Sequence, residues 1–139
     1  NRMTVSSAGA VTAMSFNPTS DRNAKQEFAA VDTQAVLEKV AQLPIQTWTF
    51  KNDPHTRHVG PMAQDFHAAF RIGPDDKHIA TVDADGVALA AIQGLNQKLE
   101  EKLAAQEGAM HSKEIRIRTL EKKLADLERL LVELSSKGN

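Results

Sequence analysis

The segment IRTLEKKLADLERLLVEL, residues 117–134, decides the fold of this chain. Its apolar residues recur alternately at intervals of three and four, which is the spacing of a coiled-coil seam. With Leu89 at position a of a heptad, the same phase continues to Leu134 without a slip, and the seam has three polar positions: Asn96, Gln106 and Lys113. A strict seven-residue repeat of this length predicts a long helix that needs partner helices, because a lone surface helix drifts off such a repeat.

The charges beside the seam favour parallel partners. In a parallel bundle a g residue reaches the e residue five positions further on in the neighbouring chain, and the pairs formed here all have opposite signs: Lys102–Glu107, Arg116–Glu121 and Lys123–Glu128. The segment RIRTLE, residues 116–121, also resembles the trimer-favouring coiled-coil pattern. We therefore predict a parallel homotrimer whose interface contains these residues: Leu89, Ile92, Leu99, Leu103, Met110, Arg116, Ile117, Leu120, Glu121, Leu124, Leu127, Leu131 and Leu134.

An antiparallel hairpin that turns within residues 106–114 is the alternative to one long helix. Gly94 and Gly108 each weaken a helix by about 1 kcal/mol relative to alanine. Both glycines, however, are predicted at outward f positions, and the heptad phase continues across Gly108. Because a turn has no reason to preserve the phase, we predict a continuous helix.

The upstream part of the chain predicts a small α+β head. Val36, Leu37, Val40 and Leu43 have helical spacing, between an N-cap at Asp32 or Thr33 and a stop at Pro44. A strand follows at residues 44–50, then a loop at residues 52–57 and a second helix at residues 61–70 with Pro61 at its first position. A turn is predicted at residues 71–78, and a short strand that ends in a loop is predicted at residues 79–86.

Three parts of the chain are thus predicted. Residues 1–19 form one or two short strands, as entry strands or the end of an upstream passenger. Residues 20–86 form the α+β head, and residues 87–135 form the trimeric coiled-coil helix. The first residues, NRMTVSSAGAV, lack the basic and apolar regions of a signal peptide, so we expect a cut from a longer chain.

The composition argues against several classes of function. The 139 residues contain 17 basic and 18 acidic side chains, so no basic excess points to nucleic acid or to a membrane surface. No apolar run is long enough to span a bilayer, and without cysteine there is neither a disulfide nor thiolate chemistry. His55, His58 and Asp53 offer metal ligands in principle, but no metal-binding motif occurs, so we expect no metal and no cofactor. Trp48 is expected in the core.

Ser20 and Lys25 are the remaining candidates for chemistry. From the local sequence alone, PTSDRNAKQEF at residues 18–28 is a turn or helix cap, or else a serine nucleophile followed by a lysine base. A serine hydroxyl needs a base within hydrogen-bond reach, and lysine acts as a base only in its neutral form. These residues by themselves leave both interpretations open.

Four segments together carry a resemblance to a known family: SDRNAK (20–25), LPIQTWTF (43–50), HVGPMAQDFHAAF (58–70) and VDADGVALAAIQGLNQKLEE (82–101). In order and spacing they resemble the endosialidase-type C-terminal intramolecular chaperone domain of phage tailspikes, tail fibres and bacterial surface proteins. The similarity covers about residues 18–101. It implies a location on a phage tail or at a bacterial surface.

The resemblance also implies a function. Three copies hold an upstream fibrous passenger in register while it folds, and the trimer then cuts itself off as a Ser/Lys self-peptidase. Ser20 corresponds to the nucleophile and Lys25 to the general base, with Asp21, Gly60 and Gln64 supporting the site. The cut is expected at Thr19–Ser20, and Ser20–Asp21 remains open.

Two other functions stay as alternatives. One is a permanent trimerisation and capping module that never cuts. The other is a conventional enzyme or ligand-binding head on a coiled coil, which would need a convergent polar pocket that the sequence does not display.

Overall fold

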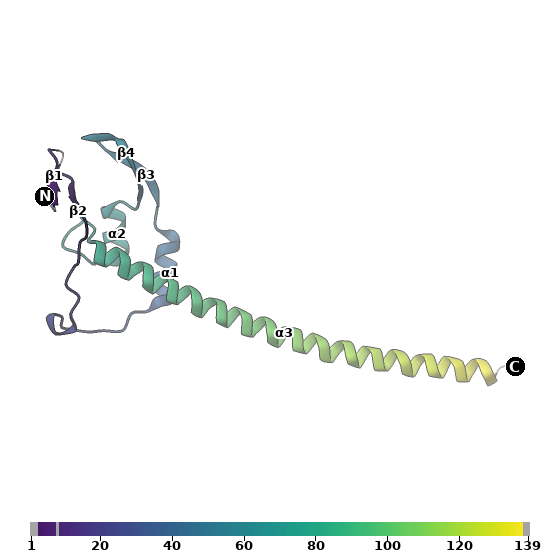
Figure 1. Ribbon diagram of the computed structural model, residues 1–139. Helices are drawn as coiled ribbons and strands as arrows, with labels where there is room; N and C mark the ends of the chain where they lie inside the picture. Colours follow the sequence, from purple (N-terminus) through teal and green to yellow (C-terminus); the bar gives the residue numbers. More distant parts are fainter. Residues whose placement is uncertain (1–2, 8, 138–139) are drawn as a thin grey trace. The chain divides into compact units, whose positions relative to one another are not determined.

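The computed structural model describes residues 3–7 and 9–137. Figure 1 shows their elements in chain order: β1 (Met3–Val5), β2 (Val11–Ala13), the 3-10 helix η1 (Arg22–Ala24), α1 (Thr33–Gln42), β3 (Gln46–Phe50), β4 (Asp53–Gly60), α2 (Ala63–Phe70) and α3 (Thr81–Lys137). The predicted α+β class with a long C-terminal helix is confirmed. By its internal contacts the chain divides into two units, Asn1–Leu95 and Asn96–Asn139.

Helix α1 forms where the sequence predicts it. The Asp32 side chain accepts a hydrogen bond from the backbone N–H of Ala35 at 3.0 Å, which caps the helix start. The helix ends at Gln42, two residues before Pro44, because proline disfavours helical backbone in the residue that precedes it.

Within the described residues the strands form two antiparallel hairpins, β1–β2 and β3–β4. The short strands predicted in residues 1–19 and the strand ending at Phe50 are confirmed. The loop predicted at residues 52–57 is wrong, because β4 begins at Asp53 and pairs with β3 from Phe50↔Asp53 to Gln46↔Gly60. Pro54 misled the prediction, yet proline is tolerated in an edge strand, and both strands of a two-stranded sheet are edges.

Helix α2 carries the best buried side chain of the head. Phe66 is only 4% exposed, and its ring lies 4.9 Å from that of Phe70. The helix begins at Ala63 with Met62 as its N-cap, so the prediction that Pro61 occupies the first helical position is wrong. It ends at Arg71 in the left-handed conformation, with φ 56°, a helix ending usually made by glycine.

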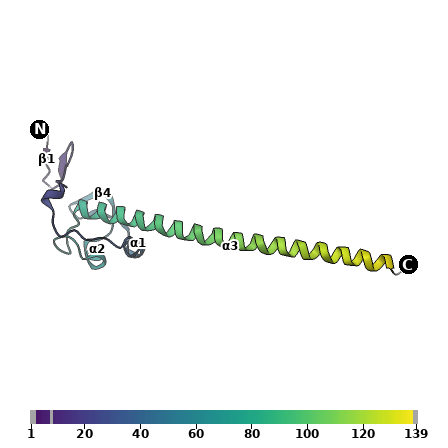
Figure 2. The same ribbon diagram turned by 90° about the horizontal axis from the view of Figure 1, so that it is seen from below.

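Helix α3 is continuous from Thr81 to Lys137, including Gly108, as Figures 1 and 2 show. The predicted continuous helix is therefore confirmed over the hairpin. The short strand predicted at residues 79–86 is wrong, because helical hydrogen bonds already join Asp83 N and Ala84 N to Ala80 O. Asp83 in the first turn also suits the positive end of the helix dipole.

The first turns of α3 have two different faces. Ala91 and Gly94 are buried, whereas Leu89 is 65% and Ile92 63% exposed. Gly94 lies off the seam, as its heptad position f predicts, but it packs against the backbone of Thr33 at the start of α1 instead of facing solvent. The seam residues predicted from the heptad pattern thus lie along one exposed side of the helix. The opposite side of its first turns is covered by the head.

Candidate functional site

Ser20 and Lys25 meet on an exposed turn between β2 and α1. The ammonium group of Lys25 donates a hydrogen bond from Nζ to Ser20 Oγ at 2.8 Å. The two residues therefore form the contact that a nucleophile and its base require, although they are five positions apart. We call the pair Ser20–Lys25 the dyad.

The local backbone explains how the two side chains meet. The Asp21 carboxylate accepts hydrogen bonds from the backbone N–H of Asn23 at 3.0 Å and from its side-chain amide at 3.1 Å. These bonds cap η1, which closes with a hydrogen bond from Lys25 N to Arg22 O at 3.2 Å. The turn reverses the chain within five residues and returns Lys25 to Ser20. Because Asp21 caps this turn through Asn23, it supports the geometry of the dyad.

Both members of the dyad are exposed to solvent in the single chain. A charged lysine only donates hydrogen bonds, and removing the serine proton requires that the hydrogen bond reverse. Burial favours the neutral form of a lysine. The geometry needed for proton transfer thus exists here, whereas a desolvated environment would have to come from additional protein surface.

The other two predicted site residues lie elsewhere in the head. Gly60 ends β4 opposite Gln46, and Gln64 lies in the first turn of α2 on an exposed surface. The hydrogen bonds found for Ser20 in the described part of the chain do not include either residue. The structure therefore brings Ser20, Asp21 and Lys25 together in one turn and leaves Gly60 and Gln64 outside it.

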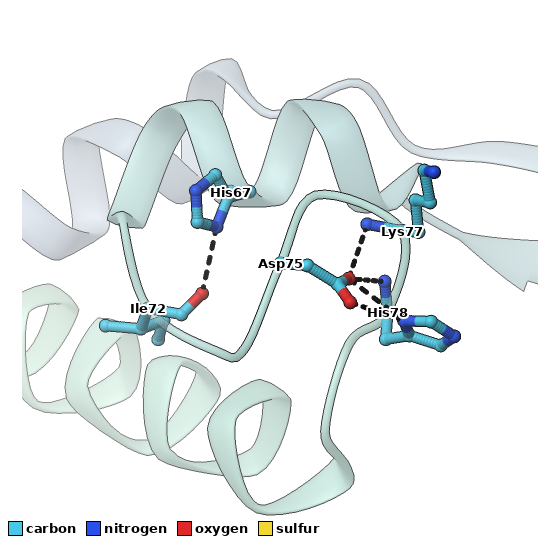
Figure 3. Close-up of polar contacts among 5 residues, drawn as sticks. All are labelled: His67, Ile72, Asp75, Lys77 and His78. Carbon is cyan, nitrogen blue, oxygen red and sulfur yellow. Dashed lines mark hydrogen bonds and ion pairs between the residues drawn. The ribbon is translucent and has the colours of Figure 1, made fainter.

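The loop between α2 and α3 is held by Asp75. Figure 3 shows its carboxylate accepting hydrogen bonds from the backbone N–H of Lys77 at 2.8 Å, from that of His78 at 3.0 Å and from the His78 ring at 2.9 Å. The Lys77 N–H first, and then the His78 side chain, hold the pKa of Asp75 below its ordinary value of 3.8. In the same view His67 Nδ1 donates to the Ile72 carbonyl at 3.3 Å. These contacts are structural, because they fix the chain just before α3.

The aromatic residues of β3 and β4 form a second cluster. The His58 ring stacks on Trp48 with centroids 4.6 Å apart, and Phe50 meets Trp48 edge to face at 4.8 Å. Across the part of the chain that the structure describes, no three His, Asp or Glu side chains gather closely enough to hold a metal ion. None of the helices there has the length and apolar character of a bilayer-spanning segment.

The apolar seam of α3 is uncovered in the single chain. Its apolar members are each between 51% and 68% exposed: Leu89, Ile92, Leu99, Leu103, Met110, Ile117, Leu120, Leu124, Leu127, Leu131 and Leu134. Arg116 and Glu121 flank the seam and are exposed as well. A contiguous apolar stripe of this kind is the mark of a surface that associates with other protein.

Residues 20–72 match the family described as chaperone of endosialidase. This match supports an endosialidase-type chaperone domain in the chain, as the first three similar segments predicted, whereas the fourth, residues 82–101, lies outside the matched range. The matched range includes the dyad, β3, β4 and α2 and ends before α3. The family suggests an intramolecular chaperone role in folding and implies association with an upstream passenger domain. No curated protein matches the chain.

The sequence did not predict the close contact that Gly94 makes with the head. The assignment of Gly94 to an outward heptad position hid its contact with α1. The available clue was the small-residue spacing of Ala90, Ala91 and Gly94, which suits close backbone approach. That spacing does not indicate which element makes the approach, so only the structure identifies Thr33 as the partner.

Proposed function

We propose that this chain is a C-terminal intramolecular chaperone that trimerises, holds an upstream fibrous passenger in register, and then releases itself by autoproteolysis next to Ser20. The observation that carries the catalytic part is the 2.8 Å hydrogen bond between Lys25 Nζ and Ser20 Oγ. In this proposal residues 1–19 enter from the passenger, residues 20–86 form the chaperone head, and residues 87–135 form the coiled coil.

The surface of the single chain supports assembly. Its accessible area is 12306 Å², whereas a compact monomer of 15.2 kDa exposes roughly 7,100 Å². The exposed residues include the apolar side chains of the seam, and each one that becomes buried contributes on the order of 1–2 kcal/mol. Partner helices on the seam of α3 would supply the burial that one copy lacks.

The charge pattern supports parallel partners, and the RIRTLE segment at residues 116–121 supports three of them. Lys102, Arg116 and Lys123 at g positions would each meet a glutamate of the neighbouring helix, and antiparallel helices would lose this register. A bundle built from local helical contacts forms quickly, whereas fibrous β-structure folds slowly through distant contacts. Early trimerisation would raise the effective concentration of the three passenger strands.

The proposed reaction is a transfer of the Thr19 acyl group. Ser20 Oγ attacks the Thr19 carbonyl carbon while Lys25, in its neutral form, accepts the hydroxyl proton. The Thr19–Ser20 C–N bond breaks, the proton passes to the leaving Ser20 amine, and an ester joins Thr19 to Oγ. Water then hydrolyses the ester, which yields a Thr19 carboxylate and a chain that begins at Ser20. Asp21 supports this site through the turn, and Gly60 and Gln64 are assigned a supporting role by resemblance alone.

Assembly would supply what the exposed dyad lacks. In the single chain both side chains are exposed to solvent. Protein from neighbouring copies would exclude water from them and favour the neutral base. Cutting would then follow assembly, so that only a trimeric passenger is released.

A permanent cap that does not cut is the second candidate. The same exposed seam favours it, because trimerisation and registration need no chemistry at Ser20. A cap would retain the segment that ends at Thr19 after folding. The conventional enzyme has no corresponding support, because both members of the dyad are exposed to solvent.

The decisive experiment uses the chain with its upstream passenger and follows intact mass during folding. The wild type is expected to split next to Ser20, Ser20→Ala to stay intact, and Lys25→Ala to split only at a small residual rate. Ser15→Ala is the matched control, because Ser15 is an exposed serine of the same segment that bonds Asn17 instead of a lysine. A wild type that trimerises without splitting would establish the cap.

The masses also decide the position of the cut. A C-terminal product that begins at Ser20 supports attack on the preceding carbonyl. A product that begins at Asp21 places the cut on the other side of Ser20, and the acyl-transfer step above would then be wrong.

A further inference from the structure

Gly94 makes a very close backbone approach to the head. A Cβ atom at this position would overlap the Thr33 carbonyl oxygen and would lie 2.7 Å from Thr33 C and 3.2 Å from Gln34 N. These are backbone atoms, which cannot rotate aside as the end of a side chain can. Because Gly94 is also buried, only glycine permits α1 to lie against α3 in this way.

Gly108 provides the contrast within the same helix. It occupies the same heptad position f, two heptads further on, and a Cβ there would meet nothing within 4 Å. Alanine is the better helix former at both positions. The contact with Thr33 therefore requires glycine at position 94, whereas no contact requires it at position 108.

The contact lies next to the segment that carries the dyad. We call residues 14–31 the arm, since they connect β2 to α1, contain Ser20 and Lys25, and are exposed throughout. The arm ends at Asp32, which caps α1 through Ala35. Lys25 is eight residues from Thr33, so the chain between them spans at most about 29 Å. The Gly94–Thr33 contact thus fixes the C-terminal end of the segment that carries the dyad against α3.

The contact between Gly94 and Thr33 leaves the seam of α3 exposed at the same height along the helix. Ile92 is exposed on the seam, whereas Ala91 and Gly94 on the other side are buried. Two residues along a helix turn the side chain by about 200°, so a partner helix on the seam does not displace α1. A single segment of α3 can therefore contact its own head and a second copy together.

We infer that Gly94 is a positioning residue for self-cleavage: by locking α1 to the non-seam face of α3, it gives the arm and its dyad a fixed place relative to the assembled helices. This inference rests on the proposed function. It explains how assembly through α3 reaches a dyad that lies in a different element.

The test compares Gly94→Ala with Gly108→Ala in the full chain with its passenger. Gly94→Ala pushes Thr33 away, and a misplacement of about 1 Å lowers the cleavage rate by about 100-fold. Trimers persist by light scattering, because position f lies outside the seam. Gly108→Ala leaves both the cleavage rate and the trimer unchanged.

A double-mutant cycle with Lys25→Ala separates positioning from a loss of stability. If Gly94→Ala acts by misplacing the base, it slows the residual cleavage of Lys25→Ala by much less than 100-fold, so the effects are not additive. If Gly94→Ala merely destabilises the head, Lys25→Ala reduces the rate by the same factor in both backgrounds. Additive effects would overturn the inference.

The outcomes distinguish this inference from the proposed function. An uncut wild type rejects the proposed function and the inference with it. A wild type that cuts, together with Gly94→Ala cutting at the same rate, overturns the inference alone. If Gly94→Ala does not trimerise, two glycines inserted between the exposed Ala29 and Ala30 decide the matter. An intact trimer with slow cleavage supports anchoring, and an unchanged rate overturns it.

Discussion

The two ends of helix α3 have the same heptad pattern but different surroundings. Between Thr81 and Gly94 one side of the helix is covered by the head, with Ala91 and Gly94 buried. Residues 95–137 are exposed on every side. The seam is nevertheless exposed in both parts, so the head does not cover it. In the proposed trimer the first part would contact both the head and the partner helices, whereas the second part would contact partner helices alone.

The largest effect is expected from breaking the distal seam. Leu120→Asp with Leu124→Asp places two carboxylates in the proposed interface, where burying unpaired charge is strongly unfavourable. The trimer is expected to dissociate and cleavage to stop, although the dyad is untouched. Light scattering and intact mass measure the two effects.

The matched control adds the same two charges outside the seam. Thr119 and Ala125 occupy positions c and b, so Thr119→Asp with Ala125→Asp should retain both the trimer and cleavage. Efficient cleavage by a monomeric Leu120→Asp, Leu124→Asp variant would contradict the coupling of cutting to assembly.

A smaller effect, limited to the head, is expected from Phe66→Ala. Phe66 is the large apolar side chain that the described residues bury best, and its removal costs about 3–5 kcal/mol. Trp48 fluorescence should report an unfolded head, while circular dichroism at 222 nm and light scattering still report associated helices. Phe28→Ala is the control, because Phe28 is 69% exposed. Loss of the trimer in Phe66→Ala would mean that the helix depends on the head.

The smallest effect concerns the loop that precedes α3. The pKa of Asp75 is lowered in the folded chain, so its ionised form stabilises the fold above about pH 4. This contribution disappears as the pH falls through the lowered folded value. The difference in Tm between the wild type and Asp75→Asn should shrink as the pH falls below about pH 4.

Asp76→Asn serves as the control for this loop, because no hydrogen bond of its carboxylate is found in the described part of the chain. It should leave the melting temperature unchanged at each pH. An equal decrease in both variants would show that general charge, instead of the Asp75 contacts, stabilises the loop.

Local patterns predicted most elements of the head. Asp32 and Pro44 marked the ends of α1 because capping and proline geometry act within a few residues. Prediction was wrong at β4, where pairing with β3 overrides the turn-forming residues Asp53 and Pro54. It was also wrong at Thr81, where residues expected to form a strand begin α3.

The candidate site was predicted in part. The resemblance selected Ser20 and Lys25, and the turn capped by Asp21 explains why residues five apart come within 2.8 Å. Gly60 and Gln64 were assigned to the site from the family's motif alone. In the described residues, the hydrogen bond of Ser20 is made with Lys25 and includes neither of them. Whether a residue supports the site in an assembled trimer depends on contacts between copies, which a motif does not describe.

The sequence by itself determined the continuous helix and its apolar seam, because both depend on a repeat that is read residue by residue. The serine and lysine that the turn brings together were selected by the family resemblance, because their local sequence is equally that of a turn. Only the tertiary structure decided which side of α3 the head covers. The heptad marks the faces that partners share, whereas the place of α1 depends on the backbone contact between Gly94 and Thr33, residues 61 positions apart in the chain.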